Sequence, residues 1–367
     1  MEFVPIMSSH LLKIKNIVKE TDKAISISFD IPDEIKSEFN YKSGQFLTLK
    51  PKIDGKIYKR AYSISSSPIT DEDITVTIKA IENGFVSNHL LNHLQINEQL
   101  EVQSPAGKFT FDFKAENQNE YVFFAGGSGI TPVISLIKSA LTIEPRSNIV
   151  LFYANRDENS IIFKQQLDYL EKKYYDRFKI VHILSRASDS YFGLRGRIDK
   201  NKAFSLIKDY VKQPQSKATH YFLCGHQGMM NEILECLDNL KISNENIHKE
   251  SFTKLNVNGF VDKNKLNVNL DNNKIVRRKI RIKIYSESFD LFVEPDETIL
   301  TAALRENLDP PFSCQIGACA SCRAKLISGK VIMDERDALT DDEIEQGYIL
   351  TCQSHPITDD VIVDYDD

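Results

Sequence analysis

The chain of 367 residues has no long apolar run, and this absence bears on its cellular location. No stretch approaches the roughly 18 uncharged apolar residues that a membrane-spanning helix needs. The opening segment, MEFVPIMSSHLLKIKN, has no basic stretch followed by an apolar core and a small-residue cleavage site, which argues against a secretory signal. We therefore expect a cytoplasmic protein with no membrane partner.

A positive net charge is missing as well. The formal charge is −6 at pH 7, so electrostatics give no reason to expect nucleic-acid binding. Internal repeats and low-complexity tracts are also absent. The length predicts two or three ordinary domains, each large enough for its own core.

The first part of the chain has the rhythm of a small β-domain. Short runs of alternating or β-branched residues, separated by turn residues, predict strands at 11–18, 24–31, 45–51, 58–66, 73–81 and 98–105. Regular short strands of this kind predict an antiparallel β-barrel, to which we assign residues 1–116.

From Tyr121 onward, apolar strands alternate with segments of helical period. The pattern predicts strands at 121–127, 148–156, 178–186 and 219–225, and helices at 131–143, 160–175, 202–211 and 228–240. Such alternation indicates βαβ units and a parallel sheet, so we expect an α/β domain over residues 117–255.

Residues 256–277 are rich in Asn, Asp and Lys without a helical period. We interpret them as a linker, with an ordered hairpin as the alternative. A third module, residues 278–367, begins with strands at 278–286 and 288–295 and a helix at 298–307, which predicts an α+β fold.

The third module carries the most specific motif. Four of the six cysteines lie there, in the pattern C-x₄-C-x₂-C followed by a distant fourth: Cys314, Cys319, Cys322 and Cys352. This is the spacing of plant-type [2Fe–2S] ferredoxins, in which four thiolates hold two irons. A zinc site is the alternative, but zinc loops more often pair two C-x₂-C knuckles. A Rieske centre is disfavoured because the loop contains no histidine; we expect His355, after the fourth cysteine, to be structural.

On these residues the third module resembles the plant-type ferredoxin family. The resemblance implies a β-grasp-like fold and makes the four cysteines the cluster ligands.

Two elements in the β-domain suit a flavin. Arg60, Tyr62 and Ser63 offer a cation for phosphate, a ring for stacking and a hydroxyl for a ring nitrogen. The later segment Gly84–Asn88 has a glycine turn that leads into a helix, typical of a phosphate site, although Ser87 or Asn88 as an ordinary N-cap explains it equally well.

In this order before a βαβ domain, the two elements resemble the ferredoxin–NADP reductase superfamily. The resemblance implies FAD, with Tyr62 against the isoalloxazine, Ser63 near its N5 and Arg60 at the diphosphate. It also implies phosphate contacts from Gly84, Ser87 and Asn88. FMN remains the alternative flavin.

A nicotinamide site is predicted from the second domain. Gly126-Gly127-Ser128-Gly129-Ile130-Thr131-Pro132 follows a strand and opens a helix, which suits a diphosphate, although it is not the G-x-G-x-x-G fingerprint. We assign nucleotide binding to Gly127, Gly129, Thr131 and Pro132. Ser185 and Arg186 follow a later strand and suit a 2′-phosphate, so we expect NADPH, with NADH as the alternative.

The same superfamily resemblance covers two further segments. Cys224-Gly225-His226-Gln227-Gly228-Met229-Met230 is similar to its C-G-P-x-x-M-M motif, with His226 in place of proline. The resemblance implies that Cys224 lies where nicotinamide meets flavin and that Glu250 lies near the flavin ring. We expect Cys236, by contrast, to be core packing.

The order of the three modules resembles the reductase subunits of multicomponent oxygenases, of the phenylacetyl-CoA epoxidase type. The resemblance implies an oxidoreductase that passes electrons from NAD(P)H through FAD and a [2Fe–2S] cluster to a protein acceptor. The main hypothesis is an oxygenase as acceptor. The alternative is a general ferredoxin or flavodoxin reductase with other acceptors.

Overall fold

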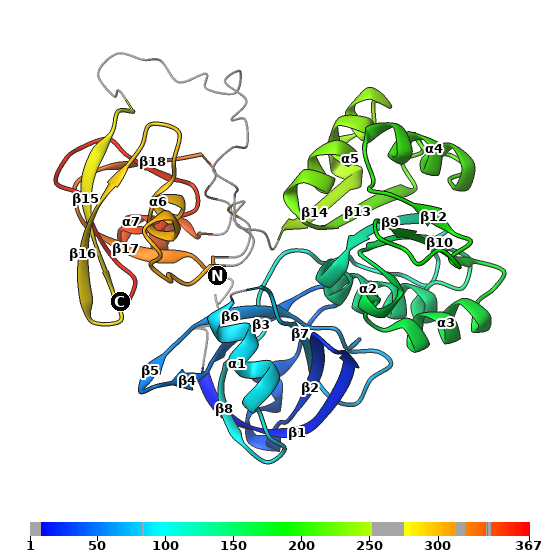
Figure 1. Ribbon diagram of the computed structural model, residues 1–367, viewed down its shortest axis with the longest axis horizontal. Helices are drawn as coiled ribbons and strands as arrows, with labels where there is room; N and C mark the ends of the chain where they lie inside the picture. Colours follow the sequence, from blue (N-terminus) through cyan, green and yellow to red (C-terminus); the bar gives the residue numbers. More distant parts are fainter. Residues whose placement is uncertain are drawn as a thin grey trace. The chain divides into compact units, whose positions relative to one another are not determined.

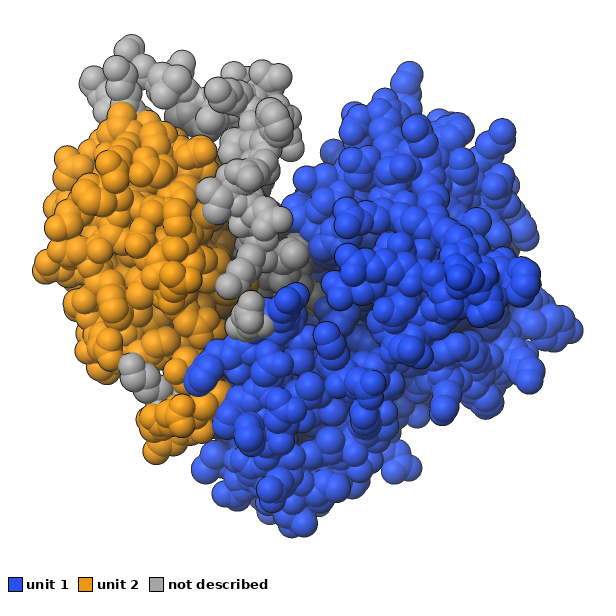
Figure 2. Space-filling model, in the orientation of Figure 1, with its two compact units in different colours: residues 1–51, 61–251 blue, residues 52–60, 252–367 orange. Residues whose placement is uncertain are grey.

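The computed structural model of the protein describes residues 9–82, 84–251, 275–312, 317, 320–334, 336 and 339–367. Contacts divide the chain into unit 1, with residues 1–51 and 61–251, and unit 2, with residues 52–60 and 252–367 (Figure 2). None of the helices in the described ranges has the length and apolar character needed to cross a bilayer.

Unit 1 begins with an antiparallel sheet in the order β6-β3-β8-β1-β2-β7. A bridge between Ile64 and Val76 joins the two ends of this order, so the sheet closes into a barrel and leaves no open edge there. The strands are β1 (Ser9–Thr21), β2 (Ala24–Asp30), β3 (Phe46–Lys50), β6 (Arg60–Ser63), β7 (Thr75–Lys79) and β8 (Gln99–Gln103); a 3₁₀ helix (Asp33–Phe39) and α1 (Phe85–His93) complete it. The expected strands and the barrel are confirmed.

The rest of unit 1 is a parallel sheet in the order β12-β11-β10-β9-β13-β14 (Figure 1). Its strands are β9 (Glu120–Gly126), β10 (Asn148–Asn155), β11 (Phe178–Leu184), β12 (Leu194–Arg195), β13 (Thr219–Gly225) and β14 (Ile247–Ser251). Its helices are α2 (Ile130–Ile143), α3 (Lys164–Lys173), α4 (Lys200–Tyr210) and α5 (Gln227–Asn239), with 3₁₀ turns at Gly127–Gly129, Glu158–Ser160 and Asn244–Asn246. The predicted α/β fold is confirmed.

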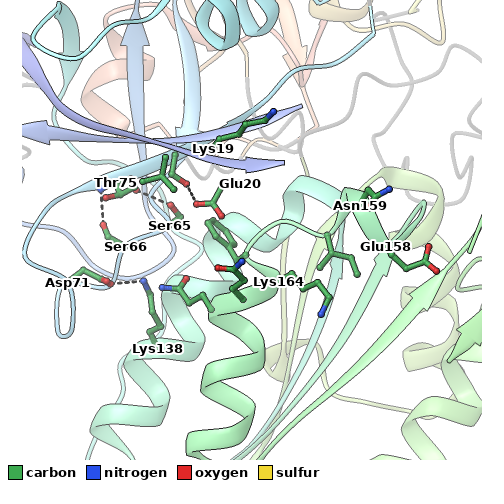
Figure 3. Close-up of a pocket in the computed structure, with 16 residues that line it drawn as sticks. Lys19, Glu20, Ser65, Ser66, Asp71, Thr75, Lys138, Glu158, Asn159 and Lys164 are labelled. Carbon is green, nitrogen blue, oxygen red and sulfur yellow. Dashed lines mark hydrogen bonds and ion pairs between the residues drawn. The ribbon is translucent and has the colours of Figure 1, made fainter. Parts of the chain in front are cut away.

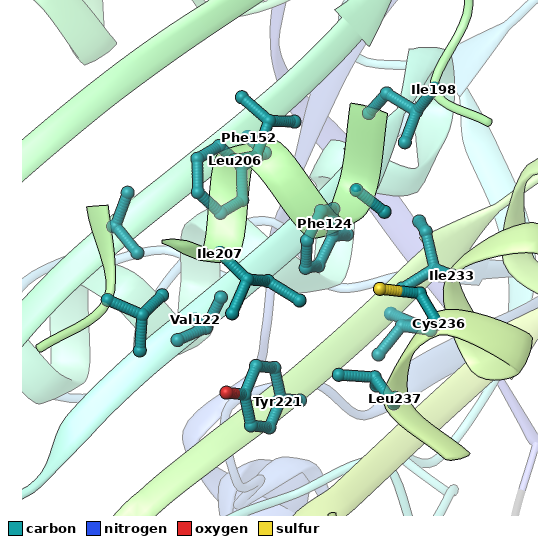
Figure 4. Packing of buried hydrophobic residues seen from close by; sticks show 14 of the residues in the cluster. Val122, Phe124, Phe152, Ile198, Leu206, Ile207, Tyr221, Ile233, Cys236 and Leu237 are labelled. Carbon is teal, nitrogen blue, oxygen red and sulfur yellow. The ribbon is translucent and has the colours of Figure 1, made fainter. Parts of the chain in front are cut away.

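Alternate residues of the parallel strands build the core of this sheet. Val122 and Phe124 of β9 and Tyr221 and Leu223 of β13 face the same way and pack against α4 and α5 (Figure 4). Successive strand residues point to opposite faces, so the residues between these core residues face the other side of the sheet, where α2 packs against β9 and β13. Cys236 is buried in the first of these clusters, as expected for core packing.

Helix α3 begins later than its apolar pattern predicts. Asp157 and Ser160 cap each other in a separate 3₁₀ turn, and Phe163 takes a left-handed φ of 60°. The chain therefore turns before Lys164, where the helix starts. The two-residue strand β12 was not predicted, because two residues carry no periodicity.

Unit 2 contains a mixed five-stranded sheet in the order β16-β15-β21-β17-β19, in which β15 and β21 run parallel. Helix α6 packs on this sheet through Ile299, Ala302 and Ala303. The elements are β4 (Lys52–Ile53), β5 (Lys56–Ile57), β15 (Arg278–Ile284), β16 (Glu287–Val293), α6 (Ile299–Arg305), β17 (Arg323–Ser328), β18 (Val331–Met333), α7 (Asp341–Glu345), β19 (Tyr348–Leu350), β20 (Ser354–Pro356) and β21 (Ile362–Asp364). The expected α+β fold is confirmed; most of the predicted linker lies outside the described residues.

Candidate functional site

The carboxyl ends of β9 and β13 lie side by side at the centre of the parallel sheet. From β9 the chain passes through α2 to β10 on one side, and from β13 through α5 to β14 on the other. Where the strand order reverses in this way, a crevice forms outside the carboxyl ends, and ligands bind there. The turn Gly126–Gly129 and the pair Cys224–Gly225 both lie at this point, so the fold brings the two predicted nucleotide motifs together.

Glycine is required at this turn for steric reasons. A Cβ at Gly129 would lie 2.0 Å from the carbonyl oxygen of Cys224, and Gly127 has a left-handed φ of 55°. Any larger side chain at position 129 would push α2 away from β13. The glycines therefore set the close approach of the helix start to the strand end.

The first turn of α2 contains two of the predicted nucleotide residues. Pro132 lies where its missing N–H costs no helical hydrogen bond. The Thr131 hydroxyl donates to the carbonyl oxygen of Ser128 at 2.9 Å and so closes the turn. Direct nucleotide contacts of these residues remain predictions.

A lysine that the sequence reasoning missed lies at the same turn. A Cβ at Gly127 would lie 3.1 Å from Nζ of Lys79, the last residue of β7. Burial lowers the pKa of Lys79, and the positive charges of Arg156 and Lys23 lower it further. The Asp157 carboxylate raises it by a smaller amount, but no carboxylate in the described part of the chain lies within ion-pair distance of this ammonium, so the site favours an anion. No local pattern in the strand distinguishes Lys79, because its neighbours come from the fold.

Cys224 is completely buried beside Glu250, its partner in the β13–β14 register. Burial raises the pKa of the Cys224 thiol well above its usual range, and the Glu250 carboxylate raises it further. The thiol is therefore neutral at pH 7. This suits a side chain that packs against a ring and excludes a thiolate nucleophile.

His226 occupies the position where proline was expected. It is the N-cap of α5, and its Nδ1 accepts a hydrogen bond from the backbone N–H of Met229 at 3.1 Å. Burial lowers the pKa of His226, and Arg197 lowers it further, so the ring stays neutral and keeps its acceptor. Histidine thus stabilises this turn by capping the helix.

The predicted flavin strand is β6, and Ser63 is its most informative residue. The Ser63 side chain is 3% exposed, and its hydroxyl has no hydrogen-bond partner among the described residues. Buried hydroxyls are almost always paired, so an orphan fits a position that a ligand atom completes. Tyr62 is half-buried on the same strand. Within unit 2, Arg60 forms an ion pair with Asp309; its contact with a diphosphate remains a prediction.

Neither Ser87 nor Asn88 caps a helix, because α1 begins at Phe85 with Gly84 as its N-cap. The Ser87 hydroxyl accepts from the N–H of Ile81 at 3.3 Å. Asn88 donates from Nδ2 to the carbonyl oxygen of Ile81 at 2.8 Å. Both side chains hold the turn before α1, which overturns the ordinary-cap alternative and leaves phosphate binding as a prediction.

Ser185 and Arg186 lie at the carboxyl edge of the sheet, next to the loop that follows β10. The N–H of Ser185 donates to Asn155 at 3.0 Å, and that of Arg186 donates to Arg156 at 2.6 Å, both to backbone carbonyls. Asn155 is 8% exposed, and neither atom of its amide has a partner among the described residues. This unpaired amide, which sequence reasoning missed, suits a polar ligand at the same edge.

Cys322 and Cys352 form no disulfide with any described cysteine, and each is 2% exposed in a small apolar cluster with Leu300 and Leu350. The Thr351 hydroxyl donates to the carbonyl oxygen of Cys322 at 2.9 Å and ties the two segments together. Two buried cysteines held in this way, without a disulfide among the described residues, fit ligands of a metal cluster. Cys314 and Cys319 lie outside the described residues.

His355 is not arranged as a metal ligand. Its Nδ1 lies 2.9 Å from the carbonyl oxygen of Glu297, and its Nε2 lies 3.0 Å from a carboxylate oxygen of Asp334. Both ring nitrogens are therefore engaged by the protein, as expected for a structural histidine.

Within unit 1, serines and a lysine of α2 join this helix to the barrel. Ser135 donates to the carbonyl oxygen of Ser66 at 2.6 Å, and Lys138 pairs with Asp71 at 2.6 Å. Lys138 and Asp71 line a cavity of about 520 Å³, shown in Figure 3, and none of the predicted flavin or nucleotide residues lines it. Because these contacts fix α2 against the barrel, they set the distance between the two halves of unit 1.

Three family models match the chain. An oxidoreductase FAD-binding domain matches residues 10–111, an oxidoreductase NAD-binding domain matches residues 123–235, and a 2Fe-2S iron-sulfur cluster binding domain matches residues 284–356. One component of the 1,2-phenylacetyl-CoA epoxidase of Escherichia coli (strain K12) is 37% identical over 358 residues, which cover 97% of this chain and 98% of that protein. The chain belongs to the ferredoxin–NADP reductase superfamily, in the branch with a C-terminal [2Fe–2S] domain.

Other similar proteins agree with this membership. The ferredoxin reductase component of 3-ketosteroid-9-alpha-monooxygenase from Rhodococcus rhodochrous is 34% identical over 359 residues, 97% of each chain. The solved structure of phthalate dioxygenase reductase has the same fold, with a TM-score of 0.58, 23% identity and coverage of 97% of this chain and 98% of that one. This member of the superfamily is an NAD(P)H-dependent oxidoreductase with FAD and a [2Fe–2S] cluster, and the cluster-domain match rules against the zinc alternative.

Proposed function

We propose that the chain accepts hydride from NADPH and delivers single electrons to an oxygenase component, with phenylacetyl-CoA epoxidase as one candidate. The names of the similar proteins support an oxygenase partner. The observation that carries the proposal is that the glycine turn, Cys224 and the Lys79 ammonium come together at the carboxyl ends of β9 and β13. A cytoplasmic location and domain boundaries at residues 116, 255 and 277 belong to the same proposal.

When bound, FAD can accept two electrons from a nicotinamide and release them one at a time, and the [2Fe–2S] cluster can carry one electron. The protein supplies position and electrostatics. In this proposal Ser63 donates its hydroxyl hydrogen to the flavin ring, Tyr62 covers the ring, and the flavin diphosphate is bound by Arg60, Gly84, Ser87 and Asn88. The neutral thiol of Cys224 and the side chain of Glu250 lie where the nicotinamide ring meets the flavin ring.

The proposal assigns the nucleotide to the carboxyl edge of the parallel sheet. Lys79 and the turn at Gly127, Gly129, Thr131 and Pro132 bind its diphosphate, while Ser185 and Arg186 bind the 2′-phosphate. Replacing Arg186 with alanine should raise KM for NADPH about tenfold, the loss of one charge-assisted contact, and leave KM for NADH within about twofold. Equal effects on both nucleotides would contradict the NADPH assignment.

Two artificial acceptors test the order of electron transfer. Ferricyanide takes electrons from a reduced flavin, whereas cytochrome c is expected to take them from the cluster. Cys352→Ala should abolish NADPH-dependent reduction of cytochrome c and keep that of ferricyanide. Cys236→Ala, which alters a buried cysteine of the core, should keep both. Retained cytochrome c reduction in Cys352→Ala would contradict the proposal.

A further inference from the structure

The side chain of Gln353 folds back onto the residue before it. Its Nε2 lies 2.8 Å from the carbonyl oxygen of Cys352 and 3.5 Å from the Cys352 sulfur. The second distance is within the range of an N–H···S hydrogen bond, because sulfur is larger than oxygen. Gln353 is 8% exposed and Cys352 is 2% exposed, so this contact is shielded from water.

The chemistry of the two partners fixes which end of the amide faces Cys352. A carbonyl oxygen accepts hydrogen bonds, and a metal-bound thiolate sulfur also accepts them. Only the amide nitrogen of glutamine has hydrogens to donate, and it has two, one for each acceptor. The reversed amide would place its oxygen against two other acceptors and is excluded.

The backbone of Gln353 is held on both sides, which keeps its side chain in place. Its N–H donates to the carbonyl oxygen of Leu350 at 2.9 Å, and its own carbonyl oxygen accepts from the N–H of Asp334 at 2.9 Å. Leu350 is completely buried. The amide therefore points at the sulfur from a rigid support.

We propose that Gln353 is a positioning residue that raises the reduction potential of the cluster through its hydrogen bond to Cys352. Reduction adds one negative charge to the cluster, part of which falls on the ligand sulfurs. A donor to that sulfur stabilises the reduced form more than the oxidised form. Exclusion of water strengthens the effect, since the local dielectric constant is low. The easier reduction favours electron flow from flavin to cluster.

This inference rests on the proposed function, because it takes Cys352 as a cluster ligand. Its test is a redox titration of the full chain, followed by the EPR signal of the reduced cluster. Gln353→Leu removes the donor at nearly constant volume. Gln346→Leu makes the same change at an exposed glutamine of the same module and is the matched control.

At the wild-type midpoint potential, the ratio of reduced to oxidised cluster should fall about tenfold in Gln353→Leu, which for a one-electron couple is a midpoint lower by about 59 mV. Gln346→Leu should keep the wild-type ratio. A fall of less than about threefold, or a rise, overturns the inference. Wild-type protein without iron and sulfide would instead refute the proposed function, so the two failures are distinguishable.

A second measurement needs no change at Gln353. In Gln315→Asn protein, which lacks the glutamine next to Cys314 and carries ¹⁵N in its remaining glutamine side chains, pulsed EPR of the reduced cluster should detect one coupled side-chain nitrogen. If Gln353→Leu loses its cluster, this signal alone decides. Its presence supports the hydrogen bond, and its absence in a protein with a normal cluster overturns it.

Discussion

At the scale of single residues, two buried serines of the barrel differ in one property that matters for ligand binding. Among the described residues, the Ser63 hydroxyl has no partner, whereas the Ser65 hydroxyl lies 2.8 Å from that of Thr77. Their side chains are equally small and almost equally buried, at 3% and 4% exposure. The difference predicts opposite effects of the same substitution.

Ser63→Ala should leave the free energy of unfolding of flavin-free protein within about 0.5 kcal/mol of wild type, because no hydrogen bond is lost. It should slow flavin reduction by NADPH about a hundredfold, the usual effect of removing one aligned donor. Ser65→Ala should lower the free energy of unfolding by about 1 kcal/mol and keep the rate. Chemical denaturation and stopped-flow absorbance measure the two effects; an unchanged rate in Ser63→Ala would exclude Ser63 from the flavin site.

Lys79 is a second residue whose importance appears only in the fold. Lys79→Met should raise KM for NADPH about tenfold, since it removes one charge-assisted contact. Lys217→Met, which removes an exposed lysine before the amino end of β13, should leave KM nearly constant. Steady-state kinetics measures both, and similar KM values for the two variants would contradict a direct role.

The lowered pKa of Lys79 gives this site a pH dependence with a definite sign. A bound diphosphate stabilises the ammonium and raises its pKa, so binding takes up a proton. Affinity for NADPH should therefore be constant at pH values where the free lysine is charged and fall as the pH rises through its lowered pKa. In Lys79→Met this alkaline fall should disappear.

At the scale of elements, sequence patterns predicted regular structure well and tertiary contacts poorly. The alternation in β1 and the helical period of α2 predicted those elements because each extends over many residues. The late start of α3 escaped prediction, since it depends on the cap between Asp157 and Ser160. The neighbours of Lys79 and Asn155 lie on other segments, and no spacing along the chain encodes them.

The cap of α5 is an element whose stability should depend on pH. The pKa of His226 is lower in the folded chain than its ordinary value of 6.5, so the unfolded chain takes up the proton first. The cap should contribute fully above about pH 6.5 and be lost as the pH falls toward the lowered pKa. His226→Ala should therefore lower the free energy of unfolding by about 1 kcal/mol at pH 8 and by progressively less in acid.

Asparagine provides the matched control at this position, because it is a good N-cap that does not titrate. His226→Asn should keep the wild-type stability at pH 8 and exceed it at pH 5. Denaturant titrations across this range measure the difference. A His226→Ala effect that stays constant with pH would mean that the ring contributes packing alone.

At the scale of the whole molecule, the chain joins three folds, and the flavin domain precedes the cluster domain in the chain as it does in the proposed electron path. The cysteine spacing was enough to predict the cluster module, because four ligands must come from a short loop and one distant residue. The flavin and nucleotide motifs were weaker alone and became informative through their order. The partner leaves no comparable pattern in this chain, so its class rests on similar proteins.

The most direct test of this account is an anaerobic titration of the purified chain with NADPH, followed by absorbance and EPR. We predict that flavin absorbance is bleached and that a reduced-cluster signal then grows to one spin per chain. A flavin that is bleached while a dithionite-reducible cluster stays oxidised would contradict electron transfer from flavin to cluster, the central claim.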